Sequence, residues 1–135
     1  MITYMKRRST DKVSFTLTHS GDDDVIAMIN PPLFDWVVEN LLKNALDAMD
    51  GQGHIKVHVQ NENVRVLIDV SDTGKGISKK HIASVFKPGF TTKKRGWGLG
   101  LSLSKRIIEP YHKGEIFVKS SEPGKGTTFR IILRK

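Results

Sequence analysis

One long amphipathic segment limits the possible folds of this chain more than any other feature. Pro31 and Pro32 suit the first turn of a helix, because a backbone N–H has no intrahelical partner there. Apolar residues then recur at the spacing of one helix face, at Leu33, Phe34, Val37, Val38, Leu41, Leu42, Ala45 and Met49. We therefore predict a helix that begins at Pro31, ends near Gly51 and buries one face in a core.

Strand-like segments lie on both sides of this helix. Alternating or continuous apolar residues predict strands over residues 13–19, 25–29, 55–59, 64–70, 114–120 and 127–133, with polar turns between them. A short helix is expected after Ser78 as far as Val85, and a longer one over Leu99–Tyr111. This order predicts an α+β fold, a two-layer α/β sandwich with about three helices on one face of a mixed five-stranded sheet.

Composition narrows the class of protein. The chain has 135 residues, 38% of them hydrophobic, which fits one domain over 1–135 with a core of about 13–134. The absence of cysteine excludes a disulfide scaffold, a thiol nucleophile and a thiolate zinc site. No stretch has the roughly 18 apolar residues of a membrane span, so we expect a cytoplasmic domain. The formal net charge of +8 indicates an anionic partner: nucleic acid, acidic lipid or a nucleotide.

The long helix carries polar residues beside its apolar stripe. Asn40, Asn44 and Asp47 fall within an arc of about 60° on a helical projection. Asparagine in mid-helix lowers helix stability, because its amide competes for backbone hydrogen bonds. Oxygen ligands for a hard cation such as Mg²⁺ would explain these residues, and so would the capping of a neighbouring loop. This segment alone leaves both interpretations open.

A glycine-containing turn follows the strand over residues 64–70. Asp72 comes directly after this strand, and Gly74 and Gly76 let the backbone turn sharply and approach a ligand closely. The Asp72 carboxylate could accept a hydrogen bond from an exocyclic amine. Val70 and Ile77 could form the apolar sides of a pocket for a planar ring. Taken alone, the same residues are also typical of an ordinary turn.

A second glycine cluster, at Gly96, Gly98 and Gly100, leads directly into the last predicted helix. Exposed N–H groups at a helix start attract anions, so this cluster is a candidate phosphate site. It lacks the spacing of both the dinucleotide fingerprint and the P-loop. The preceding segment, over 86–98, is basic. It is a candidate lid over a bound polyphosphate, but its charges are equally typical of a solvent-exposed loop.

Five motifs occur in a specific order: N-L-L-x-N-A-x-D, D-x-G-x-G-I, F-x-P-G-F-T-T-K, G-x-G-L-G-L and G-x-G-T-x-F. This order resembles the ATP-binding catalytic domain of sensor histidine kinases. The wider superfamily also holds gyrase-type, Hsp90-type and mismatch-repair ATPases. The resemblance runs from about Val13 to Arg134 and implies the superfamily's Bergerat-type sandwich, with ATP and Mg²⁺ as cofactors and ADP as product.

The resemblance also implies a role for individual residues. Asn44 corresponds to the Mg²⁺ ligand, Asp72 to the carboxylate that takes the adenine amino group, and Lys93 to a phosphate contact. Asn44 and Lys93 are the residues implied to act in catalysis. The full expected nucleotide site is Asn40, Asn44, Asp47, Asp72, Gly74, Gly76, Ile77, Phe86, Thr92, Lys93, Gly96, Gly98, Leu99, Gly100, Leu101 and Thr127. Trp97 and Asp47 depart from what many relatives carry at these positions.

One helix position separates a kinase from an ATPase. In gyrase-like relatives a glutamate that activates water stands four residues before the metal-binding asparagine, where this chain has Asn40. An amide cannot accept that proton, and Glu39 is rotated by about 100° on the helix. The resemblance therefore implies transfer of the γ-phosphoryl group to a histidine on a separate helical domain, with a response regulator downstream. None of the five histidines lies in the phosphoacceptor motif, so we expect a monomeric catalytic domain whose acceptor and sensor domains lie outside these residues.

Two other functions stay open. A serine kinase of the anti-sigma-factor type would use the same nucleotide site. A basic nucleic-acid-binding module would use the positive charge, but Lys and Arg are spread from Lys6 to Lys135 and only 7% of residues are aromatic. We therefore expect no nucleic-acid partner.

Overall fold

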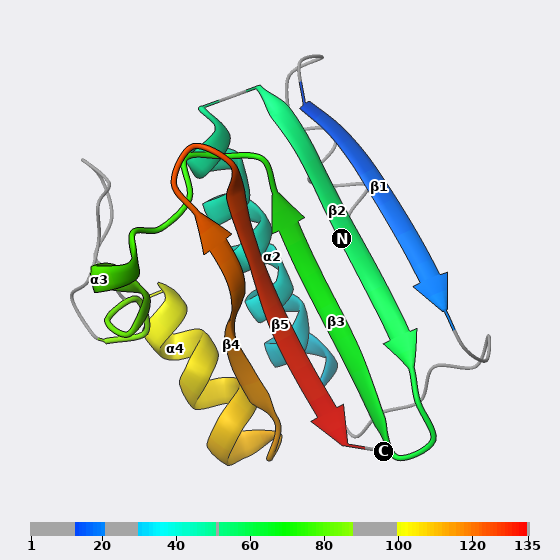
Figure 1. Cartoon of the computed structure of the whole chain (residues 1–135). Helices are drawn as coiled ribbons and strands as arrows, with labels where there is room; N and C mark the ends of the chain where they lie inside the picture. The colour runs from blue at the N-terminus through cyan, green and yellow to red at the C-terminus, as the bar shows by residue number, and fades with distance from the viewer. Residues whose placement is uncertain (1–12, 21–29, 51, 88–99, 135) are drawn as a thin grey trace.

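Five strands form one mixed sheet, as the sequence predicts (Figure 1). The computed structural model describes residues 13–20, 30–50, 52–87 and 100–134. The strands are β1 (Val13–Ser20), β2 (Gly53–Asn61), β3 (Arg65–Asp72), β4 (Glu115–Glu122) and β5 (Gly126–Arg134), in the spatial order β1-β2-β3-β5-β4. β1 and β2 pair in parallel and the other neighbours are antiparallel. The predicted strand over 25–29 lies outside the described residues.

The long amphipathic segment forms helix α2 (Pro31–Met49). Asn30 caps its first turn, where the side-chain Oδ1 accepts a hydrogen bond from the backbone N–H of Leu33 at 3.2 Å. Both prolines occupy first-turn positions, as predicted. The helix ends at Met49 because Asp50 adopts a left-handed conformation with φ of 54°. The end of the helix is thus within two residues of the predicted position.

The remaining helices are shorter than the sequence pattern predicts. α3 (Lys79–Ile82) covers only the first part of the predicted 79–85 helix. Within the predicted helix over Leu99–Tyr111, α4 (Gly100–Arg106) continues as the π-helix η1 (Ile107–Tyr111). Pro110 causes the change, because it has no N–H to donate to the carbonyl of Arg106. No helix among the described residues is long and apolar enough to span a bilayer.

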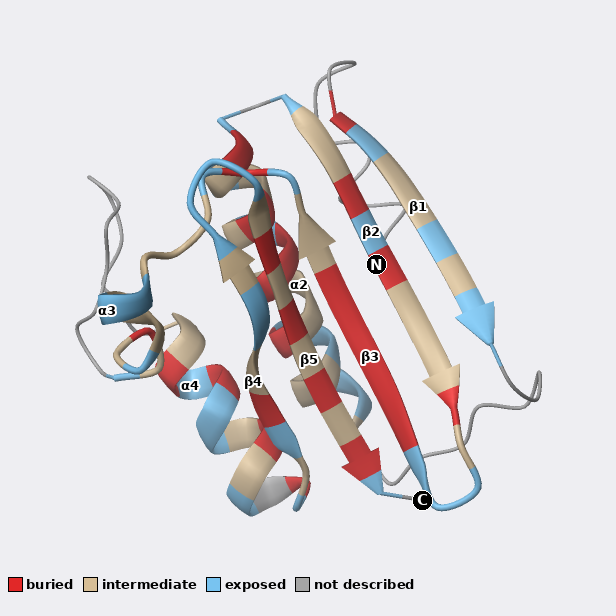
Figure 2. Ribbon diagram, in the orientation of Figure 1, coloured by how far each residue is buried: buried red, intermediate tan, exposed pale blue. Residues whose placement is uncertain are grey.

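The core lies between the sheet and α2 (Figure 2). Side chains alternate across the strands, so every second residue faces the helix layer. α2 contributes Val37, Leu41, Leu42, Ala45 and Met49. The strands contribute Ile55, Val57, Val66, Ile68, Val70, Phe129, Ile131 and Leu133. The prediction of a two-layer sandwich with its helices on one face is therefore confirmed.

The opposite face of the sheet carries an ion pair around the buried carboxylate of Asp69. Asp69 accepts hydrogen bonds from Arg130 Nε at 2.7 Å and Nη2 at 2.9 Å, and Lys119 Nζ lies 3.4 Å from the same carboxylate. Burial alone would raise the pKa of Asp69. The hydrogen bonds and charge of Arg130, and then those of Lys119, outweigh burial and hold this pKa below its ordinary value. The triad therefore stabilises the fold at neutral pH and loses its contribution as the pH falls through the lowered pKa.

Candidate functional site

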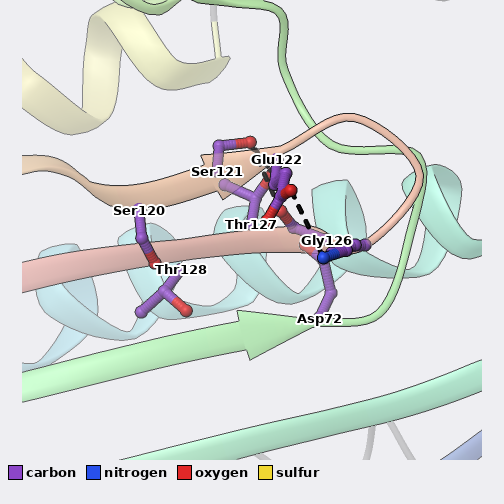
Figure 3. Close-up of a pocket in the computed structure, with 8 residues that line it drawn as sticks. Asp72, Ser120, Ser121, Glu122, Gly126, Thr127 and Thr128 are labelled. Atoms are coloured by element: carbon purple, nitrogen blue, oxygen red, sulfur yellow. Dashed lines mark hydrogen bonds and ion pairs between the residues drawn. The ribbon is translucent and has the colours of Figure 1, made fainter.

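A pocket of about 280 Å³ opens at the end of β3 (Figure 3). It lies beside the hairpin that joins β4 to β5, and its lining is mostly polar. The lining residues are Asp72, Ser120, Ser121, Glu122, Lys125, Gly126, Thr127 and Thr128. Two of the residues that the sequence predicts for a nucleotide site, Asp72 and Thr127, are thus brought together here from different strands.

Asp72 is the central acidic group of this pocket. It is the last residue of β3, on the same face as the helix-facing residues Val70 and Ile68, two and four positions earlier. Its Oδ1 accepts a hydrogen bond from the backbone N–H of Gly74 at 2.8 Å, and the backbone N–H of Thr127 also donates to the carboxylate. Burial raises the pKa of Asp72, and the two backbone hydrogen bonds only partly oppose that rise. Ionised Asp72 therefore favours a further hydrogen-bond donor in the pocket.

Close packing explains the two glycines of the turn after Asp72. A Cβ atom on Gly74 would lie 2.6 Å from the carbonyl oxygen of Ala48 on α2, and Lys75 N–H donates to that same oxygen at 3.0 Å. Gly76 has φ of +75°, and a Cβ atom there would collide with the carbonyl of Glu122. The turn is therefore held between the end of α2 and the β4–β5 hairpin.

A row of residues on α2 connects this turn to the start of α4. Asn40, Asn44 and Ala48 stand four residues apart, so they share one helix face. At one end of the row, a Cβ atom on Gly100 would lie 2.5 Å from Asn40 Oδ1. At the other end, Ala48 touches Gly74. Both asparagines are half-buried, whereas Asp47 is exposed. The structure thus places the α2 asparagines between the turn after Asp72 and the start of α4 at Gly100.

Ser104 fixes the orientation of one asparagine. Its hydroxyl donates to the carbonyl of Gly100 at 2.8 Å and accepts a hydrogen bond from Asn40 Nδ2 at 3.2 Å. Ser104 is fully buried. The sequence alone does not single out Ser104, because its partner Asn40 lies 64 positions away in the chain.

Phe86 lies against the core. Its ring packs edge-on against Phe129 with centroids 6.1 Å apart, and Lys105 Nζ lies 5.5 Å from its centroid. Phe86 therefore anchors the start of the candidate lid. Ile77 and Leu101 are half-buried and also pack against the core. The predicted residues Thr92, Lys93, Gly96, Gly98 and Leu99 lie outside the described residues, and so does Trp97.

The site contains few protein groups that bind metal. Across residues 13–20, 30–50, 52–87 and 100–134, no three His, Asp or Glu side chains come together as a metal-binding set. The oxygen donors beside the α2 row are instead amides. Such a set fits a cation held mainly by phosphate and water with one or two protein oxygens, which is how Mg²⁺ accompanies nucleotides.

A family model described as histidine kinase-, DNA gyrase B- and HSP90-like ATPase matches residues 29–135. The chain belongs to this family. The match covers the α2 asparagines, the turn after Asp72, the candidate lid and the β4–β5 hairpin. It confirms the superfamily that the order of the five motifs indicates.

The curated proteins similar to this chain include a sensor histidine kinase and a sporulation kinase. Sensor histidine kinase ZraS of Salmonella typhimurium is 45% identical over 105 residues, which are 77% of this chain and 22% of ZraS. Sporulation kinase E of Bacillus subtilis is 42% identical over 113 residues, which are 83% of this chain and 15% of that kinase. The chain thus spans about a fifth or less of the length of these relatives.

Solved structures agree with this family assignment. The nucleotide-free catalytic domain of histidine kinase ThkA superimposes with a TM-score of 0.82 at 29% identity, covering 99% of this chain and 84% of that domain. A structure of ThkA in complex with the response regulator TrrA matches with a TM-score of 0.78 at 27% identity, over 99% of this chain and 36% of that one. The fold described above is therefore that of a histidine kinase catalytic domain.

Proposed function

We propose that this domain binds Mg²⁺-ATP and transfers the γ-phosphoryl group to a histidine on a separate helical domain. The observation that carries the proposal is Asp72, a partly buried carboxylate that faces a pocket and has a raised pKa. Within the described part of the chain, it accepts hydrogen bonds from the backbone N–H groups of Gly74 and Thr127. Its unused lone pairs suit the amino group of adenine, which would restore the hydrogen bonding that burial removes.

The α2 row supports a position for the phosphates. Asn40 meets the first residue of α4 at Gly100, and the preceding glycines and Lys93 belong to the candidate lid. A triphosphate that extends from Asp72 along Asn44 toward Gly100 would follow this row. Mg²⁺ bound there would neutralise charge on the phosphate oxygens, and Asn44 is the protein ligand that we propose for it.

The surroundings of Asn40 favour phosphoryl transfer over water attack. Its amide nitrogen donates to Ser104, so the side chain is held by α4 and has no basic atom to accept a proton from water. The neighbouring Glu39 pairs with Lys43 at 3.2 Å along the helix. Phosphoryl transfer to a presented histidine is achieved mostly by positioning and charge neutralisation, so it requires no base from this domain.

The partners follow from this reaction. The domain would act in the cytoplasm, where ATP is supplied, on the dimerisation and phosphoacceptor helices of a sensor kinase. The phosphoryl group would then pass to a response regulator, as the ThkA complex with TrrA suggests for that relative. We propose no nucleic-acid partner.

Mixing the chain with the helical domain from the same gene and γ-labelled ATP tests this proposal. We expect label on the helical domain that is stable to base and lost in acid, as phosphohistidine is. The matched control is the same helical domain with its acceptor histidine replaced by glutamine, which should stay unlabelled. Bound ATP without transfer would contradict the kinase proposal, and acid-stable label would support a serine kinase instead.

A further inference from the structure

Ser121 joins the two sides of the pocket at Asp72. It lies on β4, and its Oγ accepts a hydrogen bond from the backbone N–H of Ile77 at 2.7 Å. The same oxygen lies 2.8 Å from Thr127 Oγ1 on β5 (Figure 3). The backbone N–H of Thr127 donates to Asp72, so Ser121 links the turn at Ile77 to the residue that holds the carboxylate.

The Ser121 hydroxyl has one proton to donate. The Ile77 N–H can only donate, so Ser121 must accept there and has one proton left to donate. That proton has two possible acceptors, Thr127 Oγ1 at 2.8 Å and the carbonyl of Gly126 at 3.4 Å. The 2.8 Å contact has the usual length of an O–H···O bond, in which either hydroxyl can be the donor, and the 3.4 Å contact is long. With Ser121 as the donor in this bond, the Thr127 hydroxyl keeps its own proton to donate into the pocket.

A carboxylate acceptor beside a hydroxyl donor matches one edge of adenine. Adenine presents its amino group as a donor next to a ring nitrogen that accepts. Guanine presents the reverse, a carbonyl acceptor next to a ring N–H donor. With guanine in the same orientation, Asp72 would face a carbonyl oxygen and the Thr127 proton would face an N–H. Each mismatch leaves a buried polar group without a hydrogen bond, which is a strong basis for rejection.

We propose that Ser121 is a positioning residue that turns the Thr127 hydroxyl into a donor and so makes the pocket select adenine over guanine. This inference rests on the proposed function, because it assumes that the base lies at Asp72. It assigns to β4 a part in nucleotide selection that the five sequence motifs do not include.

Affinities of the 135-residue chain for ATP and GTP, measured by calorimetry, test the inference. Ser121→Ala removes the hydroxyl that orients Thr127, so the ATP-over-GTP ratio should fall by about 10-fold, the effect of one neutral hydrogen bond. Ser121→Thr keeps the hydroxyl and should keep the wild-type ratio. Should Ser121→Ala fail to fold, Thr127→Val removes the Thr127 hydroxyl itself with the side-chain shape retained, and the same fall is expected.

Ser71→Ala is the matched control. Ser71 Oγ and Thr128 Oγ1 form a hydroxyl pair of the same 2.8 Å length; Thr128 lines the pocket, but Ser71 is not among the lining residues and does not contact Thr127 through this pair. This variant should lose similar stability and keep the wild-type ratio. Equal ratios in Ser121→Ala and Ser71→Ala would overturn the inference, and so would a loss that Ser121→Thr shares. A wild-type chain that binds neither nucleotide would instead overturn the proposed function itself.

Discussion

Replacing Asp72 with asparagine should lower the affinity for ATP by about 100-fold and leave the fold intact. The amide can accept one hydrogen bond from Gly74 or Thr127, but its NH₂ group must then face a donor, either the other backbone N–H or the adenine amine. Nucleotide titration by calorimetry measures the loss. ATP affinity close to wild type would remove Asp72 from the site.

The same substitution should not weaken the nucleotide-free protein. The folded-state pKa of Asp72 is raised, so its ionised form lowers stability at neutral pH, an effect that fades as the pH falls through the raised pKa. Asparagine carries no such charge. We therefore expect the thermal midpoint of Asp72→Asn to equal or exceed that of the wild type.

Asp69→Asn is the matched control for this substitution. Asp69 lies three residues earlier on the same strand but on the opposite face, in the ion pair with Arg130. Its loss leaves the partly exposed guanidinium of Arg130 without its anionic partner, at a cost of about 1 kcal/mol in the free energy of unfolding. We expect Asp69→Asn to unfold at a lower temperature yet bind ATP normally, the opposite of Asp72→Asn. If both variants lost binding and stability together, the two aspartates would not have separate roles.

Replacing Asn44 with alanine should remove the magnesium dependence of nucleotide binding and lower phosphotransfer by about 100-fold. Alanine is a good helix former, so α2 should persist. The side-chain oxygen proposed as the Mg²⁺ ligand is lost, while the contacts of Asp72 with the base remain. ATP titrations with Mg²⁺ and with a chelator measure the dependence directly.

Lys43→Ala is the neighbouring control for Asn44. Lys43 is exposed on α2 and pairs only along the helix with Glu39, in an interaction that contributes little to stability. This variant should keep the full magnesium response. An Asn44→Ala protein that also keeps it would show that Asn44 has a structural role instead.

Local patterns explain how much of the fold the sequence predicts. Paired prolines and a regular apolar face identify α2 almost to the residue, because first-turn chemistry and burial act within the segment itself. The sheet is equally predictable from strand alternation. The change to a π-helix was not predicted, because the prediction over Leu99–Tyr111 rested on the spacing of apolar residues alone. Pro110 has no N–H, and this alters the hydrogen bonding of the last turn.

Some residues of the candidate site can be predicted from the sequence, and others are revealed only by the structure. Asp72 can be detected from its local sequence, because an acidic residue between an apolar strand and a glycine-containing turn is unusual. Ser104 and Ser121 cannot, because their importance comes from contacts across 64 and 44 positions of the chain, with Asn40 and Ile77. Only the packing of α2 against α4, and of the β4–β5 hairpin against the turn, brings these partners together.

Thermal denaturation of the 135-residue chain with increasing ATP, with and without Mg²⁺, tests the central claim most directly. A ligand that binds only the folded state at about 100 times its Kd adds about 2.7 kcal/mol of stability. We predict a midpoint that rises by several degrees with Mg²⁺-ATP, rises less with ATP and a chelator, and does not respond to ATP in Asp72→Asn. An unchanged midpoint at millimolar Mg²⁺-ATP would contradict the account.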